Sequence, residues 1–356
     1  MATNTPSDTP TKAQWDALCR DVKSNLLEEV GEETWYLIIV SRHILPLCAL
    51  LPGHVKSGIF HRKTQDEAGW TMIHDDSSSF LSTITDILNT FTSLYGTLPS
   101  QPLAYYHTSY HATVLTVSPR PHLLAEFWTH LTHTDAEFST AESQSRLSTR
   151  LGDVLLKQLT LIGAPQMLSA LIPLAKSQTQ NKGEEQRGEL DLSSWSSTTL
   201  PALHAHGIET ITSIYGDLWP SIFKTFGPHR PVVGFHELTI VYGLYLSDFT
   251  HLTPLETEIV VFTSITCQGL KGPSLWHVRG LGRVLGARGS DEETPKMRRI
   301  KDIIRGVKTA IASVVEFVGP EMVARSRLDG GPDGLQGWPN VGDVLRDLGG
   351  WGDDGP

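Results

Sequence analysis

Helical periodicity is the feature that most constrains what this chain can fold into. In its clearest segments apolar residues recur every three or four positions, and no segment alternates apolar and polar residues for more than a few positions. Such spacing places apolar side chains on one face of an α-helix, whereas a half-buried strand needs strict alternation. The sequence therefore predicts an all-α fold.

Glycine and proline divide the first half of the chain into helical and irregular parts. We expect residues 15–176 to form an N-terminal helical part with an irregular insertion at about 53–120, in which only 80–94 shows a convincing helical pattern. Near its end the pattern predicts two helices, 147–162 and 166–176, separated by a Gly-Ala-Pro break.

Polar segments mark the expected boundaries. Residues 177–199 lack apolar periodicity and are interpreted as a linker or long surface loop. Residues 1–14 and the Gly-, Asp- and Pro-rich tail 321–356 are expected to be disordered, although Trp338 and Trp351 in that tail are compatible with docking on the body.

The composition limits the classes of partner and location. The chain has 356 residues and a formal net charge of −10, which argues against nucleic acid or an anionic membrane as a partner. No stretch approaches the roughly 18 apolar residues of a membrane span, and the first dozen residues resemble no targeting segment. The cysteines Cys19, Cys48 and Cys267 are odd in number and far apart, as in a reducing compartment. We therefore expect a cytoplasmic protein.

Histidines between residues 107 and 133 could suggest a metal site. The pairs His107/His111 and His130/His133 have spacings that place two imidazoles on one helix face, and His122 lies between them. No acidic residue or cysteine completes a ligand set there, so we expect ordinary surface or packing histidines and no metal. We also expect no other cofactor.

A strong helix start precedes the most informative segment. Thr253, Pro254 and Glu256 form an N-cap, a proline at the first helical position and a capping-box carboxylate, so Glu256 is interpreted as structural. At about 100° per residue, Glu258 lies on the apolar side of this helix. A carboxylate placed there is desolvated, which raises its pKa unless a partner compensates.

That partner is predicted on the next helix. His277 follows Glu258 by 19 residues, after a Gly- and Pro-containing break, and shares a helix face with Gly280, whereas Arg279 and Arg283 project to the opposite face. Glu258 and His277 can form an acid/base pair, or a buried hydrogen bond that only satisfies two polar groups. Both interpretations remain open at this point.

These residues resemble a known family. The run YGLYLSDFTHLTPLETEIVVFTSITCQGLKGPSLWHVRGLGRVLGARGSDEE resembles the AhpD-like fold of alkylhydroperoxidase D-type proteins and gamma-carboxymuconolactone decarboxylases, with Glu258, His277, Gly280 and Gly286 at the characteristic positions. The segments RLGDVLLKQLTLIGAPQMLSALIPL and GEETWYLIIV also look like fungal-type members. The resemblance implies an AhpD-like helical bundle over residues 200–320, extended by the N-terminal part, that assembles as a homo-trimer or hexamer.

The resemblance also separates two branches of chemistry. Thiol-peroxidase members carry two cysteines where this chain has Leu270 and Pro273, so dithiol redox chemistry is not expected. Cys267 remains as an alternative single nucleophile for peroxidase activity, or as an apolar packing residue.

The decarboxylase branch uses neither cysteine nor metal, and resemblance to it implies a lyase or isomerase that acts on a small carboxylated or enolisable metabolite. His277 would be the proton donor or shuttle and Glu258 its orienting partner. Tyr242 and Trp276 are candidate substrate-binding residues, or plain packing aromatics. The alternative from another functional class is a non-catalytic AhpD-like scaffold that recruits another protein.

A last apolar stripe runs from Met297 to Val315 on the helix that follows Ser290 and Thr294. Subunit assembly and packing within the chain explain this stripe equally well.

Overall fold

The computed structural model describes residues 10–26, 111–117, 120–179, 198–290, 293–318 and 338–353. Within these ranges the chain is helical, and its one β feature is an isolated bridge between Gly289 and Gly352. The predicted all-α fold is therefore confirmed. The expected helix at 80–94 and most of the expected insertion and linker lie outside the described residues.

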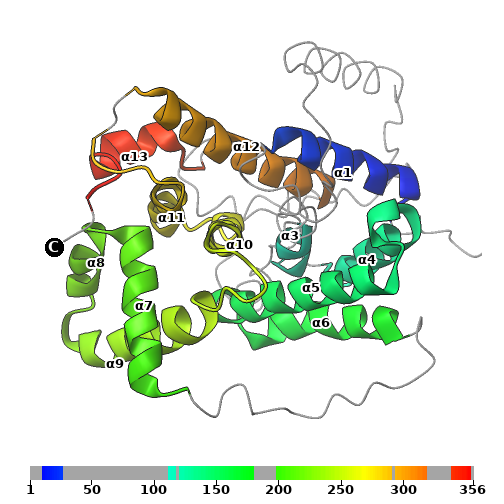
Figure 1. The fold of residues 1–356 in the computed structure, drawn as a ribbon, viewed down its shortest axis with the longest axis horizontal. Helices are drawn as coiled ribbons and strands as arrows, with labels where there is room; N and C mark the ends of the chain where they lie inside the picture. Colours follow the sequence, from blue (N-terminus) through cyan, green and yellow to red (C-terminus); the bar gives the residue numbers. More distant parts are fainter. Residues whose placement is uncertain are drawn as a thin grey trace, which may run out of the picture. The chain divides into compact units, whose positions relative to one another are not determined.

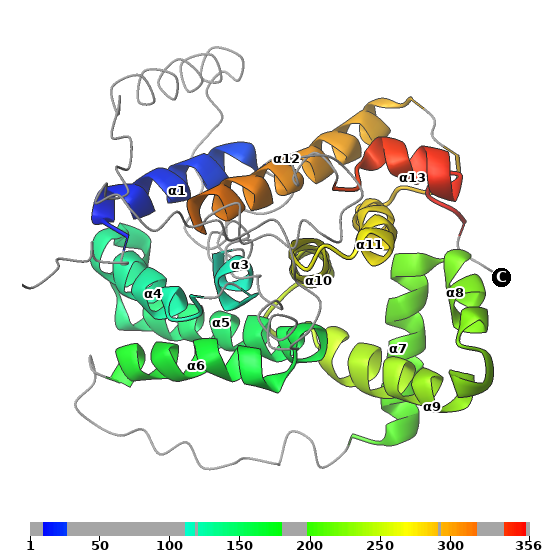
Figure 2. The same ribbon diagram turned by 180° about the vertical axis from the view of Figure 1, so that it is seen from behind.

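The first group of helices comprises α1 (Lys12–Asn25), α3 (His111–Val117), α4 (Leu123–Thr134), the 3-10 turn η3 (Ala136–Phe138), α5 (Ala141–Ile162) and α6 (Ala164–Thr179). The second comprises α7 (Leu200–Tyr215), α8 (Leu218–Thr225), η5 (Gly227–His229), α9 (Arg230–Phe235), η6 (His236–Leu246), α10 (Pro254–Cys267), α11 (Lys271–Val284), α12 (Pro295–Val318) and α13 (Val341–Leu348). Figures 1 and 2 show α5 running beside α6 and α12 beside α1. No helix within the described ranges combines the length and apolar character needed to cross a membrane.

Several helix ends follow from local sequence. Thr253 caps α10 and accepts from the backbone of Glu256, whose side chain binds the Thr253 N–H in return, as predicted. A second capping box starts α5 at Thr140, so this helix begins before the predicted residue 147, and Gly163 with a φ of 81° ends it.

Disorder was expected for residues 1–14 and 321–356, and this prediction is wrong for part of each segment. Thr11 caps α1, which begins at Lys12, inside the segment 1–14. In the expected tail, Asn340 caps α13, and Trp338 and Trp351 are both buried. Glycine and aspartate content suggested disorder, but the docked tryptophans supply the apolar surface that holds residues 338–353 in place.

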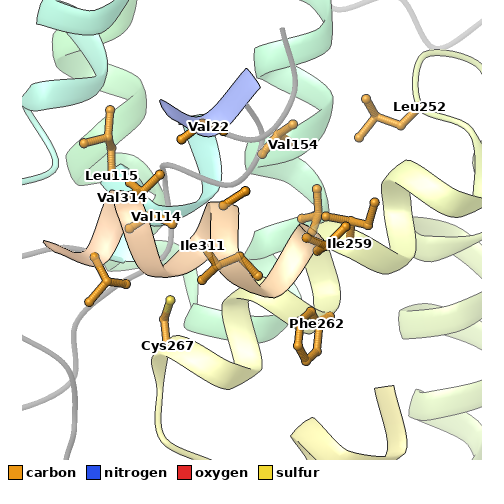
Figure 3. Close-up of a cluster of buried hydrophobic side chains, with 14 of the residues drawn as sticks. Val22, Val114, Leu115, Val154, Leu252, Ile259, Phe262, Cys267, Ile311 and Val314 are labelled. Carbon is orange, nitrogen blue, oxygen red and sulfur yellow. The ribbon is translucent and has the colours of Figure 1, made fainter. Parts of the chain in front are cut away.

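The larger core surrounds α10, in which every residue from Glu256 to Cys267 is buried. Figure 3 shows this core, where Val22 of α1 and Val154 of α5 lie with Ile311 of α12 and with Cys267. The apolar stripe predicted on α12 is buried here, so packing within the chain accounts for it. Each such fully buried aliphatic side chain stabilises the fold by about 1.5–3 kcal/mol.

A smaller second cluster joins α7, η6, α10 and α11. Here α7 and η6 touch at backbone distance, because a Cβ added at Gly207 would overlap the carbonyl of Leu238 and one at Gly243 the carbonyl of Leu203. The 11-residue element η6 is a π-helix, a rare form that occurs mostly as short insertions within α-helices and is frequent at functional sites. Tyr242, one of the candidate residues, belongs to this cluster, and Trp276, another, packs against it.

Candidate functional site

Glu258 and His277 are in direct contact. His277 Nδ1 lies 2.7 Å from Glu258 Oε1, and the two side chains are 2% and 1% exposed. The contact forms because α10 and α11 are joined by the short turn 268–270 and pack against each other. The sequence thus placed both residues on the faces where the structure has them.

Gly280 makes this approach possible. A Cβ at this position would overlap Glu258 Oε1 and lie 2.7 Å from the Cγ2 atom of Ile214 on α7. The space that the glycine leaves on α11 is therefore filled by two neighbouring helices. It is not an open site for a small ligand.

Tyr215 extends the pair on its other side, and the sequence analysis missed it. Its hydroxyl lies 2.9 Å from His277 Nε2 and 2.9 Å from the hydroxyl of Tyr242. Glu258, His277, Tyr215 and Tyr242 thus form one continuous hydrogen-bonded chain, named here the relay. The sequence contained a pattern that could have indicated Tyr215. This residue follows the inward-facing Ile211 and Ile214 and directly precedes a helix-ending glycine.

Burial sets the protonation of the relay. It raises the pKa of Glu258, and the neighbouring His277 counteracts part of that rise. Burial also raises the pKa values of Tyr215 and Tyr242, so both phenols keep their protons near neutral pH and can donate. Glu258 Oε2 is buried and has no hydrogen-bond partner among the described residues.

Each ring nitrogen of His277 has a distinct role in this arrangement. If Nδ1 of a neutral imidazole donates to the carboxylate, Nε2 accepts a hydrogen bond from the Tyr215 hydroxyl. If His277 is an imidazolium, Nε2 donates to the Tyr215 oxygen instead. The relay can therefore hold its protons in more than one arrangement without moving a heavy atom.

Trp276 does not belong to the relay but packs against it. It is half-buried, and its ring centroid lies 6.4 Å from that of Tyr215, at an interplanar angle of 67°. Trp219 approaches the same tyrosine at 6.2 Å. The two indoles cover the tyrosine end of the relay. Tyr215 and Tyr242 are 7% and 5% exposed, so this end is more exposed than the end formed by Glu258 and His277.

Cys267 lies apart from the relay. It is fully buried in the larger core, as Figure 3 shows, nine residues or about 14 Å along α10 from Glu258. A thiol that peroxide cannot reach is unsuited to be a nucleophile. The position favours the interpretation of Cys267 as a packing residue.

The histidines of the N-terminal part have other partners. His130 Nε2 lies 3.3 Å from Asp16 Oδ1, and His133 Nδ1 lies 2.7 Å from the carbonyl oxygen of Thr129. His107 and the side chain of His111 are outside the described residues. Among the residues that the structure does describe, no group of three or more His, Cys, Asp or Glu side chains is arranged to hold a metal ion.

Surface hollows of about 670, 230 and 220 Å³ lie in the described part of the chain. The largest lies between the first half of α7 and the end of η6, where His206, Asp248 and His251 contribute to its lining. None of the three is lined by a residue of the relay.

Comparison with known proteins gives no independent assignment. The sequence matches no protein-family model and no functionally curated protein, and the chain matches no solved structure. The function must therefore be argued from the relay itself.

Proposed function

We propose that this chain is an acid–base enzyme, a carboxymuconolactone decarboxylase-like lyase or isomerase for a small carboxylated or enolisable metabolite. The observation that carries the proposal is the relay, in which four proton-carrying side chains from four separate helices are hydrogen-bonded in sequence. The AhpD-like resemblance of the segments around Glu258 and His277 supports the same assignment.

The reaction consistent with this geometry is the protonation of a carbanion. When the bond to a substrate carboxylate breaks, carbon dioxide leaves and the electron pair stays on carbon as a carbanion or enolate. The Tyr215 hydroxyl then gives its proton to that carbon, and the phenolate takes a proton from Nε2–H of the His277 imidazolium. His277 is left neutral with its Nδ1–H on Glu258, and solvent restores the proton afterwards.

Each residue has a defined part in this scheme. Tyr215 and Tyr242 meet the substrate at the more exposed end, with Trp276 as a wall beside them. His277 is the proton shuttle. Glu258 fixes the orientation of the imidazole through the 2.7 Å hydrogen bond between its Oε1 and Nδ1.

The test is a screen of small carboxylic and enolisable metabolites with the purified protein, followed by Glu258→Gln and His277→Ala variants. We expect the rate to fall about 10²- to 10⁴-fold, the usual contribution of a positioned acid or base. Glu256→Gln is the matched control, because Glu256 lies two residues away on α10 but binds Thr253 and Arg150 instead. If the two relay variants turn over a substrate as fast as the parent, the proposal fails.

A second candidate is a non-catalytic scaffold, and one observation favours it. All relay side chains are at least nine-tenths buried, and the three hollows are lined by other residues. A scaffold predicts that the Glu258 and His277 variants lower the melting temperature, and that the parent turns over none of the metabolites screened.

Assembly into a homo-trimer or hexamer, which the resemblance implies, is part of the same proposal. The stripe on α12 is buried within the chain, whereas Leu156 on α5 and Ile172 on α6 are 52% and 51% exposed. These exposed residues are the better candidates for an interface. Light scattering of the purified protein measures the number of subunits, and a monomeric mass would contradict this part of the proposal.

A further inference from the structure

Two buried arginines on α11 connect the relay to the C-terminal part of the chain. Arg279 and Arg283 lie one helical turn apart, are 2% and 1% exposed, and lie off the face that carries His277. Their sequence pattern predicted no role for them. Their hydrogen bonds run in two directions, toward the end of α7 and toward residues 350–353, named here the strap.

The first direction fixes the end of α7, where Tyr215 is the last residue. Arg279 Nη1 donates to the carbonyl oxygen of Tyr215 at 2.6 Å, and Arg283 Nε donates to that of Ser213 at 3.1 Å. The last carbonyls of a helix lack partners within the helix and carry its negative partial charge, so cationic donors are favoured there. Arg279 also pairs with Asp217, just beyond the helix.

The second direction fixes the strap. Arg279 Nε donates to the carbonyl oxygen of Gly350 at 3.0 Å, and Arg283 Nη1 donates to those of Trp351 and Gly352 at 3.0 and 3.1 Å. The strap is further held by the bridge between Gly289 and Gly352. Each guanidinium thus bonds α7 with one part of its fork and the strap with another.

Glycines permit this close approach on both sides. A Cβ at Gly282 of α11 would overlap the six-membered ring of Trp351, which is fully buried. Gly352 has a φ of 65°, and a Cβ there would overlap the guanidinium of Arg279. The sequence HVRGLGRV therefore carries, on one helix, a relay residue, the two arginines and the glycine against which the strap packs.

We propose that Arg279, Arg283 and the strap are positioning elements of the relay: the strap holds the arginines in place, and the arginines hold the backbone of Tyr215 so that its hydroxyl reaches His277. The catalytic role of these positioning elements rests on the proposed function. The positional coupling itself is tested without any substrate. A strap that moves should change the hydrogen bond at His277 Nε2, although the strap carbonyl oxygens accept hydrogen bonds from Arg279 and Arg283 and not from the relay side chains.

The test uses the full-length chain with labelled histidine, in which the imidazole nitrogen signals of His277 are assigned by their loss in a His277→Asn sample. Gly282→Ala forces a methyl group into the Trp351 ring and displaces the strap. Gly272→Ala is the matched control, since it lies on the same helix and an added Cβ there meets nothing within 4 Å. We expect the Nε2 signal of His277 to shift by more than its line width in Gly282→Ala and to stay in place in Gly272→Ala.

A second pair of variants tests the arginine directly. Arg279→Lys keeps the charge but cannot reach Tyr215, Gly350 and Asp217 together. Arg346→Lys is its control, because Arg346 of α13 is exposed and pairs with Asp343 and Asp347. We expect the Nε2 signal to shift only in Arg279→Lys.

Thermal melting separates positioning from plain stabilisation. If Gly282→Ala and Arg279→Lys lower the melting temperature while the His277 signals match those of the parent, the strap is only a tether and the proposal is overturned. That result would leave the acid–base function standing, since the metabolite screen tests it separately. If a substrate is found, both variants should lower kcat more than they raise KM.

Discussion

Two buried polar networks contact η6, and they differ in kind. Lys157 on α5 is fully buried and donates to Asp153 Oδ1 at 3.1 Å and to the carbonyl oxygens of Tyr245 and Asp248 at 3.3 and 2.7 Å. In this network the ammonium can only donate hydrogen bonds, and the two carbonyl oxygens can only accept them. In the relay, the imidazole and both phenols can each donate or accept.

The difference shows that a buried ionisable group does not by itself indicate proton chemistry. Lys157 donates hydrogen bonds to carbonyl oxygens at and just beyond the end of the π-helix, where a fixed positive charge is favourable. The buried polar groups of the relay are also hydrogen-bonded to one another, but the protons of the relay have alternative positions. The two networks therefore predict different responses to substitution and to pH.

The largest expected effect is at Lys157. Lys157→Met leaves the carboxylate of Asp153, whose pKa burial already raises, without its cation, and should lower the free energy of unfolding by about 3–5 kcal/mol. Lys12→Met is the control, because Lys12 pairs with Asp16 at the same spacing of four residues but is 65% exposed, and should cost about 0.5 kcal/mol or less. Urea unfolding measures both values, and equal losses would contradict the assignment of Lys157 as a structural anchor.

The next effect is steric and concerns the relay. Gly280→Ala introduces a methyl group that overlaps Glu258 Oε1 and crowds Ile214, so we expect a loss of about 1–3 kcal/mol in unfolding free energy. Gly272→Ala on the same helix meets open space and should be neutral or more stable by up to about 1 kcal/mol. If Gly280→Ala proves as stable as Gly272→Ala, α10 and α11 cannot be packed as closely as the structure shows.

The parts of the relay that could be predicted from the sequence depend on neighbouring segments. The capping box of Thr253 and Glu256 fixes the start of α10, and a short turn brings α11 against it, so the inward faces of Glu258 and His277 followed from helical phase. Local rules were enough because the two residues are only 19 positions apart on consecutive helices.

The remaining parts depend on contacts between distant segments. Tyr215 reaches His277 across 62 positions and Tyr242 across 27, and Gly207 and Gly243 allow the close packing of α7 against η6, which carries Tyr242. The docking of Trp351 depends likewise on Gly282, in a segment whose composition suggested disorder. Helical phase shows which side of a helix faces inward, but it does not show which distant helix that side will meet.

The third effect is on the pH dependence of stability. Because burial raises the pKa of Glu258, the folded chain keeps a proton there at pH values where the unfolded chain has lost it. Stability contributed by this proton is present below the ordinary carboxyl pKa of about 4.3 and is lost as pH rises through the higher folded value, with a slope of at most about 1.4 kcal/mol per pH unit. Glu258→Gln should remove this part of the slope in urea unfolding measured between pH 4 and pH 7. An identical slope in the variant would mean that Glu258 does not retain its proton in the fold.

The smallest expected loss of unfolding free energy is at Tyr242, the outer end of the relay. This substitution compares the two networks most directly. Tyr242→Phe removes the hydroxyl that is hydrogen-bonded to Tyr215, and the change should cost about 0.5–1.5 kcal/mol. Tyr245→Phe is the matched control on the same π-helix, since Tyr245 meets Lys157 through its backbone carbonyl and keeps that contact. If the relay is one coupled chain, Tyr242→Phe changes the pH dependence of unfolding as well as its free energy, because Tyr215 then has only His277 as a partner. An effect on free energy alone would make Tyr242 a packing residue with a buried hydrogen bond, and the relay would end at Tyr215.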